Sequence, residues 1–351
     1  MYKRIIRLEA RREKNGEPFF VTEELRIHCE MEISIAQQLT QAKITIYNLS
    51  RETSNALCSG DHTAGPVDTA GSLRRASKVF IRLYAGYADE RLSTGQLPQL
   101  LEGIVMNASA QRKVPNHLTH LFVLPLSSAL LRQTFAPFAA TPGMTLKTAL
   151  TKICQLIGFS SISFDVSEKL LSQSVRGKTF IAETDAYQTL HQLGKTYGFT
   201  FSQRASGIGF YPKLRRSNSV FIQNEFNHLQ KNGQPYVVNP LLLNGVPTAG
   251  IMTLTVPIIL DGSIFPGWVI DVSQIQGTRG DLALPSQGLI DYTPMGANIY
   301  YQDDIAKYAV LQKYMAERVV HKLDNYADVW GTIIIGAVPT VGDFGRGEQR
   351  G

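Results

Sequence analysis

The sequence has few cysteines and no long hydrophobic run. Its 351 residues include three cysteines, at scattered positions and never in a C-x-x-C pair. This pattern excludes a disulfide framework and a cysteine-ligated structural zinc site. The longest apolar stretches, 121–131 and 251–260, fall well short of the roughly 18 residues that a membrane-spanning helix needs. The three cysteines are Cys29, Cys58 and Cys154.

A secretory signal is also missing, because the basic residues at the start run into further charge and not into an apolar segment. We therefore expect assembly in a cytoplasm. Positive charge is only mildly in excess, since 35 Lys and Arg residues against 29 Asp and Glu residues give a net charge of +6. A nucleic-acid-binding surface needs clustered Lys and Arg side chains. In this sequence the basic residues form small groups at the ends of β-like runs, which is typical of solvated strand ends. The groups are Arg11-Arg12, Arg74-Arg75, Arg112-Lys113, and Lys213 with Arg215-Arg216.

The first 125 residues favour β structure. In 25–35 the apolar residues occupy every second position, which is the period of a strand with one wet face. Ser50 as a cap and Glu52 in the first turn predict a short helix between two of the strands. A loop is predicted over 59–77, where the sequence is rich in Gly, Ser and Thr and shows no periodicity. The expected strands are 25–35, 42–47, 78–87, 99–110 and 117–125. Several short strands are typical of a sandwich or barrel.

The middle of the chain shows helical spacing. A helix is predicted from a Thr145 cap to Gly158, and a second from an Asp185 cap to Gly198. A hairpin of 199–203 and 208–211 follows. The length of the chain suits two or three domains, and this stretch predicts a small α+β domain.

The last third returns to β. We expect strands at 251–260 and 268–273, and a loop over 277–297 that is rich in Gly and Pro. The apolar pattern of 305–320 fits a helix as well as a strand, whereas 313–321 and 329–338 are predicted to form a hairpin. We expect Trp330 to pack inside this last domain and fix the register of the hairpin. A subunit contact is the alternative role for that ring.

No cluster of residues predicts catalysis. His117 and His120 are three apart on a strand, so they face opposite sides and cannot share a metal. His28 and Cys29 diverge for the same reason, which removes a thiolate–imidazole pair. Gly207-Ile-Gly209 lacks the third glycine and the strand-to-helix context of a dinucleotide loop. We predict no catalytic, cofactor-binding or metal-binding residue, and no cofactor.

The string AKITIYNLSRET at 42–53 precedes VFIRLYAGY at 79–87 and LEGIV at 101–105. These strings resemble the N-terminal domain of bacteriophage tail baseplate hub proteins. The string TDAYQTLHQLGKTYGFTF at 184–201 is similar to the middle-domain helix and hairpin of that family. LNGVPT at 243–248 is similar to its G-x-P turn, and VHKLDNYADVWGT at 320–332 to its H-x-x-D and W-x-T hairpin.

The resemblance implies an α+β fold that is predominantly β, with two barrel-like tube domains flanking a small α+β middle domain. The expected domains are 1–127, 128–214 and 215–351, the last with a long loop at 274–303. In that family a homotrimer matches a sixfold tail tube to a threefold central spike. The implied partners are two further copies, a tail tube or tube-initiator protein, a spike protein and other baseplate proteins, with no membrane. The implied location is the tail baseplate of a virion assembled in a host cytoplasm.

Two other functions remain open at this point. A tail-associated cell-wall hydrolase would need a carboxylate pair or a metal site, and the candidate acids show no spacing that indicates one. Adjacent acids such as Asp303 and Asp304 more commonly cap a short helix than bind a cation. A basic nucleic-acid-binding module is the third hypothesis. The candidate acids are Glu102, Asp165, Glu183, Asp185, Asp324 and Asp328.

Overall fold

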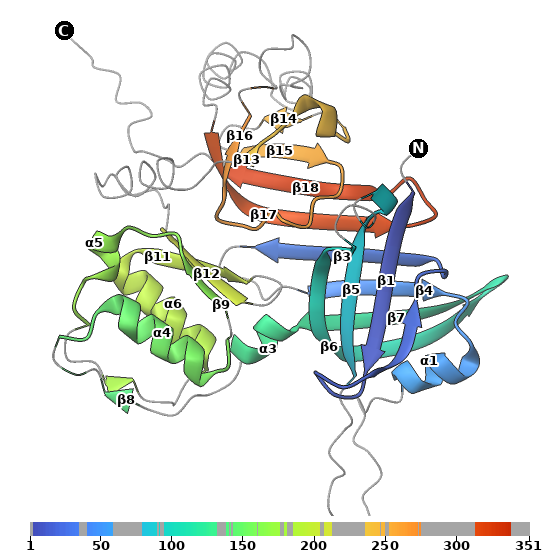
Figure 1. Cartoon of the computed structure of the whole chain (residues 1–351), viewed down its shortest axis with the longest axis horizontal. Helices are drawn as coiled ribbons and strands as arrows, with labels where there is room; N and C mark the ends of the chain where they lie inside the picture. The colour runs from blue at the N-terminus through green and yellow to red at the C-terminus, as the bar shows by residue number, and fades with distance from the viewer. Residues whose placement is uncertain are drawn as a thin grey trace, which may run out of the picture.

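The computed structural model describes most of the chain and is predominantly β (Figure 1). The described residues are 3–34, 41–58, 79–89, 91, 95–131, 138–139, 141, 143–159, 161–175, 179–180, 185–203, 207–212, 236–245, 247–249, 253–272, 274 and 313–337. The predicted loops at 59–77 and 277–297 lie outside them, as do Arg74-Arg75, Glu183, Lys213, Arg215-Arg216 and Asp303-Asp304. Within the described ranges, no helix has the length and apolar character that a membrane crossing requires.

The described part of the N-terminal region includes seven strands and a capped helix. The strands are β1 (Arg4–Arg11), β2 (Pro18–Thr22), β3 (Ile27–Ser34), β4 (Gln41–Tyr47), β5 (Phe80–Tyr87), β6 (Gln99–Lys113) and β7 (Asn116–Pro125), and the helix is α1 (Arg51–Cys58). The five predicted strands are confirmed. So is the helix, because Ser50 Oγ accepts a hydrogen bond from the Thr53 backbone N–H at 3.0 Å.

Strands β1 and β2 were not predicted. Charged residues interrupt the apolar pattern of β1, and one of them, Glu9, is 4% exposed. Its carboxylate pairs with Arg7 at 2.8 Å and with Arg11 at 2.6 Å. A buried charge is tolerated when it is paired and hydrogen-bonded. Because position 9 holds such a charge, the apolar pattern of the sequence does not reveal that this position faces the core.

The middle region contains two small sheets, β10-β8 and β11-β12-β9, that do not join the large sheet. Its elements are α3 (Leu126–Leu131), β8 (Phe138–Ala139), α4 (Leu146–Leu156), β9 (Ser161–Phe164), α5 (Glu168–Leu171), β10 (Thr179–Phe180), α6 (Ala186–Tyr197), β11 (Phe199–Gln203) and β12 (Gly207–Pro212). Both predicted caps are confirmed: Thr145 Oγ1 and Asp185 Oδ1 accept hydrogen bonds from backbone N–H groups in the first turns of α4 and α6. Gly198 ends α6 with a left-handed φ of 83°.

The C-terminal region contributes β13 (Tyr236–Val237), a 3-10 turn (Pro240–Leu242), β14 (Thr248–Ala249), β15 (Thr253–Ile258), β16 (Val269–Asp271), β17 (Lys313–Asp324) and β18 (Trp330–Ala337). The predicted hairpin is confirmed, since β17 and β18 pair antiparallel. The ambiguous stretch is a strand from Lys313 onward, and its earlier part lies outside the described residues.

The two end regions share one sheet, which runs in the order β14-β15-β18-β17-β3-β4-β7-β6-β5-β1-β2. Strand β17 pairs antiparallel with β3, so the sheet crosses from the C-terminal to the N-terminal region without a break. Figure 1 shows the orange and blue strands side by side at this point. Two separate barrels were expected. The described strands form no closed barrel. To close one, β3 would have to pair with a strand at the other end of the N-terminal set, but that edge of β3 pairs with β17.

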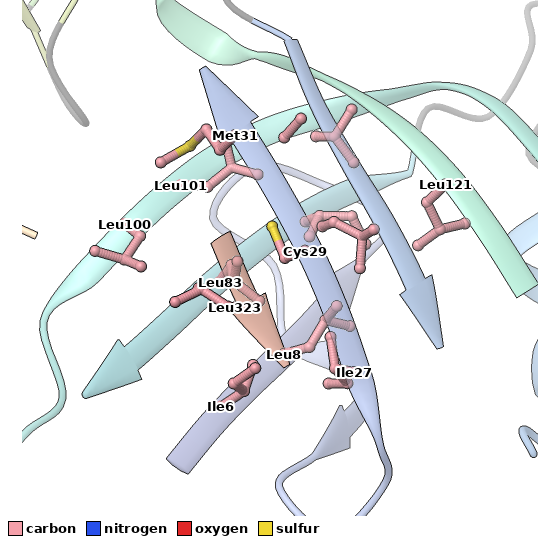
Figure 2. Close-up of a cluster of buried hydrophobic side chains, with 14 of the residues drawn as sticks. Ile6, Leu8, Ile27, Cys29, Met31, Leu83, Leu100, Leu101, Leu121 and Leu323 are labelled. Carbon is pink, nitrogen blue, oxygen red and sulfur yellow. The ribbon is translucent and has the colours of Figure 1, made fainter. Parts of the chain in front are cut away.

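Three clusters of buried apolar side chains lie in the N-terminal, middle and C-terminal regions. The N-terminal cluster includes Leu323 and Trp330, which come from the C-terminal hairpin. Figure 2 shows Leu323 among Leu83, Cys29 and Leu8. The ring of Trp330 is 3% exposed, as expected of a core residue. Its expected location was wrong, because it packs in the core of the first region and not in that of the last.

Candidate functional site

The pairing of β17 with β3 forms a junction between the two ends of the chain, and its solvent face carries opposite charges. Arg318 lies 3.2 Å from the Glu32 carboxylate, and Lys322 lies 3.6 Å from that of Glu30. Because these side chains are about 40% exposed or more, each pair contributes little to stability, on the order of 0.2–1 kcal/mol. Their opposite signs nevertheless favour this register over one that places like charges side by side.

A buried carboxylate organises the turn at the end of β17. Asp324 accepts hydrogen bonds from the backbone N–H groups of Tyr326 and Ala327, both at 3.0 Å, and from Arg26 Nη2 at 2.9 Å. Burial alone would raise the pKa of Asp324, but the Arg26 and backbone hydrogen bonds lower it below the usual value. Asp324 is therefore occupied with the fold of the turn, and its predicted candidacy as a hydrolytic acid has no geometric support.

Asn325 ties the same turn to the start of β3. Its side-chain Oδ1 accepts a hydrogen bond from the Ile27 N–H at 2.9 Å, and its Nδ2 donates to the Leu25 carbonyl at 2.9 Å. One amide thus satisfies two backbone groups about 300 positions away in sequence. Sequence reasoning missed this residue, because an Asn in a polar turn gives no signal of a distant backbone partner.

His321 and Thr332 form a buried pair between β17 and β18, with His321 Nδ1 and Thr332 Oγ1 3.0 Å apart. Desolvation lowers the pKa of His321 to about 4, although the Asp261 carboxylate acts in the opposite direction. The imidazole is therefore neutral at neutral pH. The letters H and T of the VHKLDNYADVWGT string thus belong to one packed contact inside the hairpin.

Trp330 completes the junction. Its ring meets Tyr87 edge-on with 6.0 Å between centroids, and the Arg4 guanidinium lies 5.7 Å from the ring centre. Arg4 Nη1 also donates to the Ala327 carbonyl at 2.7 Å. The next residue, Gly331, leaves no room for a side chain, since a Cβ there would lie 2.6 Å from the Ile258 carbonyl oxygen. The W-G-T letters therefore fit a site where strands from both end regions approach closely.

A groove of about 870 Å³ opens beside Trp330. Strand β1, the end of β5 and the 324–329 turn contribute to its walls. The charged side chains on its lining balance, because three are basic and three acidic. They are Lys3, Arg4, Arg91, Glu23, Glu24 and Asp328. The groove therefore presents no concentration of one sign that would hold a phosphate or a metal ion.

The other residues weighed for chemistry serve the fold or lie apart. Glu102 pairs with Arg82 at 2.8 Å, and Asp185 caps α6. His120 contacts Thr45 Oγ1 at 3.0 Å. Burial raises the pKa of Cys29 to about 12, which disfavours a thiolate. Across the described ranges, no group of three or more His, Cys, Asp or Glu side chains could hold a metal ion.

Comparison with solved structures then places the fold. A tail protein from Neisseria meningitidis MC58 superposes with a TM-score of 0.51 at 7% identity, over 96% of this chain and 97% of its own. The fold is shared with phage tail proteins. The 43 kDa tail protein of prophage MuSo2 from Shewanella oneidensis gives the same TM-score and identity, over 95% of this chain and 97% of its own.

A third similar structure is the E. coli c3393 protein, a component of the type VI secretion system, with a TM-score of 0.47 and 10% identity over 94% of this chain and 76% of its own. No protein-family model matches the sequence. A search of curated proteins finds no match either. At such low identities the likeness concerns the fold, and the role of this chain is a separate inference.

Proposed function

We propose that this protein is the central hub of a phage-type tail baseplate, a homotrimer that joins a sixfold tail tube to a threefold spike. The observation that carries the proposal is the likeness of fold to two tail proteins over almost the full length of each chain. Because the match extends over almost the whole length of each chain, it supports the same arrangement of all three regions, and not the likeness of a single domain.

The junction of the end regions supports the same role. An adaptor of this kind needs two tube-like units per chain, so that three chains supply six. We propose that 1–127 and 215–351 are those units and that 128–214 is the middle domain. The continuous sheet through β17 and β3 would hold the two units at a fixed angle, which a ring with six equivalent positions requires.

The absence of a predicted catalytic residue fits a structural role, in which contact surfaces perform the function. The partners we propose are two further copies of the chain, the tail tube or its initiator, a separate spike protein and other baseplate proteins. The protein would act in the virion tail after assembly in the host cytoplasm. Buried acids such as Asp324, which are saturated by hydrogen bonds within the fold, fit this role better than that of a wall hydrolase.

Native mass spectrometry tests the proposal. The chain has a mass of 38.9 kDa, so we expect a species of three times that mass, and a larger complex of three chains with three spike chains when the two proteins are co-expressed. Electron microscopy of either species should show a threefold ring with an open centre.

A chain that stays monomeric alone and with its spike would contradict the hub. Dye release from purified cell-wall material would favour a hydrolase, and a salt-dependent mobility shift of DNA would favour a nucleic-acid module.

A further inference from the structure

The hairpin of β6 and β7 carries a long strand edge that has no partner among the described residues. Strand β5 pairs with β6 only between Gln99 and Ile104, and the Val105 N–H donates to the Val79 carbonyl. Beyond that point, β7 is the one strand among the described residues that pairs with 106–113. Figure 1 shows this hairpin reaching past the neighbouring strands. We call residues 106–118 the arm.

The arm is exposed, and its ionised side chains are all basic. Seven of the eight residues from Met106 to Lys113 are exposed, and the eighth is half-buried. At the tip, Val114 is 78% exposed beside Arg112 and Lys113. No Asp or Glu occurs in 106–118. An uncovered strand edge with apolar side chains is a site of strand addition, and its basic tip favours an acidic partner.

An edge of complementary character lies at the end of the large sheet. Strand β2 pairs with β1 alone in the described part of the chain. Two of its apolar side chains reach solvent, since Phe19 is 39% and Val21 is 43% exposed. The segment from Glu17 to Glu24 contains three glutamates and no basic residue. Glu23 pairs with Arg91 at 2.7 Å within the chain and the Arg12 guanidinium lies over the Phe19 ring, so Glu17 and Glu24 are the acids available to the arm. At the other end of the sheet, β14 has only two residues, which is too short to support a ladder.

We propose that the arm of one copy adds as a strand to the β2 edge of the next copy. Each chain carries both halves of this contact, so the contact is head-to-tail and can close a ring. The unpaired backbone N–H and C=O groups of the two strand edges would hydrogen-bond to each other. The basic side chains at the tip of the arm would lie near the glutamates at the two ends of β2. The exposed apolar side chains of the arm and of β2 would be covered by the contact. The proposal rests on the trimeric ring described above and assigns the surfaces that build it.

Disulfide trapping tests the contact in the full-length chain. Cys58 is the one cysteine of the three that is not buried, so the background is Cys58→Ser. In that background, Val21→Cys is combined with Ser109→Cys or with Gln111→Cys, two arm positions that sample neighbouring registers. We expect mild oxidation to give covalent dimers and trimers from at least one combination, and none from any single cysteine.

The matched control pairs Val21→Cys with a cysteine on a surface outside the contact. Leu156 on α4 is 44% exposed and belongs to the middle region, so Leu156→Cys should give no covalent ladder. A covalent dimer from the single arm cysteine would instead indicate an arm-to-arm contact and overturn the proposal.

Charge reversal gives a second measurement. Arg112→Glu with Lys113→Glu should weaken self-association about tenfold, because two interfacial ion pairs of moderate strength are lost. Combining it with Glu17→Lys and Glu24→Lys should restore much of the loss. The control, Lys152→Glu with Lys169→Glu on the middle region, changes the net charge equally and should have no such effect.

The outcomes separate this contact from the proposed function. A wild-type protein that is monomeric at every concentration contradicts the ring itself. A wild-type trimer that yields no cross-link and tolerates the reversal at Arg112 and Lys113 keeps the ring and overturns the contact between the arm and β2.

Discussion

Two of the junctions between regions of this molecule differ in kind. The end regions meet through a backbone ladder in which β17 pairs with β3 from Arg318 to Asp324. The middle region keeps two small sheets of its own. It meets the C-terminal region through a turn, where Ser202 Oγ donates to the Pro266 carbonyl at 3.1 Å and Gly267 lies against the Tyr211 ring. A shared ladder couples two regions more tightly than a few side-chain contacts. We therefore expect the two ends to unfold together and the middle region to unfold separately.

Trp330→Ala should have the largest effect on this comparison. The ring fills part of the N-terminal core while it belongs to the C-terminal hairpin, so its loss leaves a cavity at the junction and should cost about 3–5 kcal/mol of unfolding free energy. Hydrogen exchange should accelerate in both end regions and not in α4 or α6. Urea titration gives the size of the loss.

Two further tryptophan variants sharpen that result. Trp330→Phe should cost less, because the indole N–H is buried with no hydrogen-bond partner among the described residues, and its removal leaves no polar group unsatisfied. Trp268 packs against the C-terminal cluster, so Trp268→Ala should accelerate exchange in that region alone. If Trp330→Ala gave the same local pattern as Trp268→Ala, the two ends would not form one unit.

Acid should weaken the end regions through His321. Its pKa is about 4 in the fold and about 6.5 in an unfolded chain, so between these values the unfolded state binds more protons and stability falls as pH falls. Lowering the pH from about 7.5 to about 5 should cost roughly 2 kcal/mol from this residue. Unfolding titrations of wild type and His321→Gln measure it, since the variant lacks the titrating group. Equal pH slopes in the two proteins would contradict the assignment.

Gly267→Ala should loosen the junction of the middle region. Gly267 has a φ of +96°, and a Cβ at this position would lie 2.4 Å from a ring carbon of Tyr211. The combined backbone strain and overlap should cost roughly 1–2 kcal/mol. Exchange should rise in β11, β12 and near Ala316, whose carbonyl accepts from the Gly267 N–H, while the β17–β3 ladder from Arg318 to Asp324 stays protected. Gly143→Ala is the matched control, because Gly143 has a similar φ with open space around it; protection lost equally in β3 would argue against separate junctions.

The smallest expected effect belongs to the ion pair between Arg318 and Glu32. Both side chains are well exposed, so a double-mutant cycle with alanine at each position should give a coupling of about 0.2–1 kcal/mol. About 1 M salt should remove most of it. A coupling that exceeds this range and persists in salt would mean that the charges hold the junction more strongly than the backbone ladder suggests.

The sequence by itself determined the local elements of this protein. Alternating apolar residues were enough to locate β3, and the Ser50, Thr145 and Asp185 caps marked the starts of three helices, because strand period and cap chemistry depend on neighbours a few positions away. The same reasoning missed β1, where Arg7 and Arg11 neutralise an inward-facing Glu9.

Only the tertiary structure decided how those elements combine. The side chains of Arg26 and Asp324 meet across 298 positions of sequence, and no local period identifies such a partner. The edge of β3 could satisfy its backbone groups by closing a barrel or by accepting β17, since both choices present the same donors and acceptors. The choice depends on the total free energy of the contacts at the junction, including Trp330 against Tyr87 and Asn325 against the start of β3. These contacts form only when the two ends of the chain lie together.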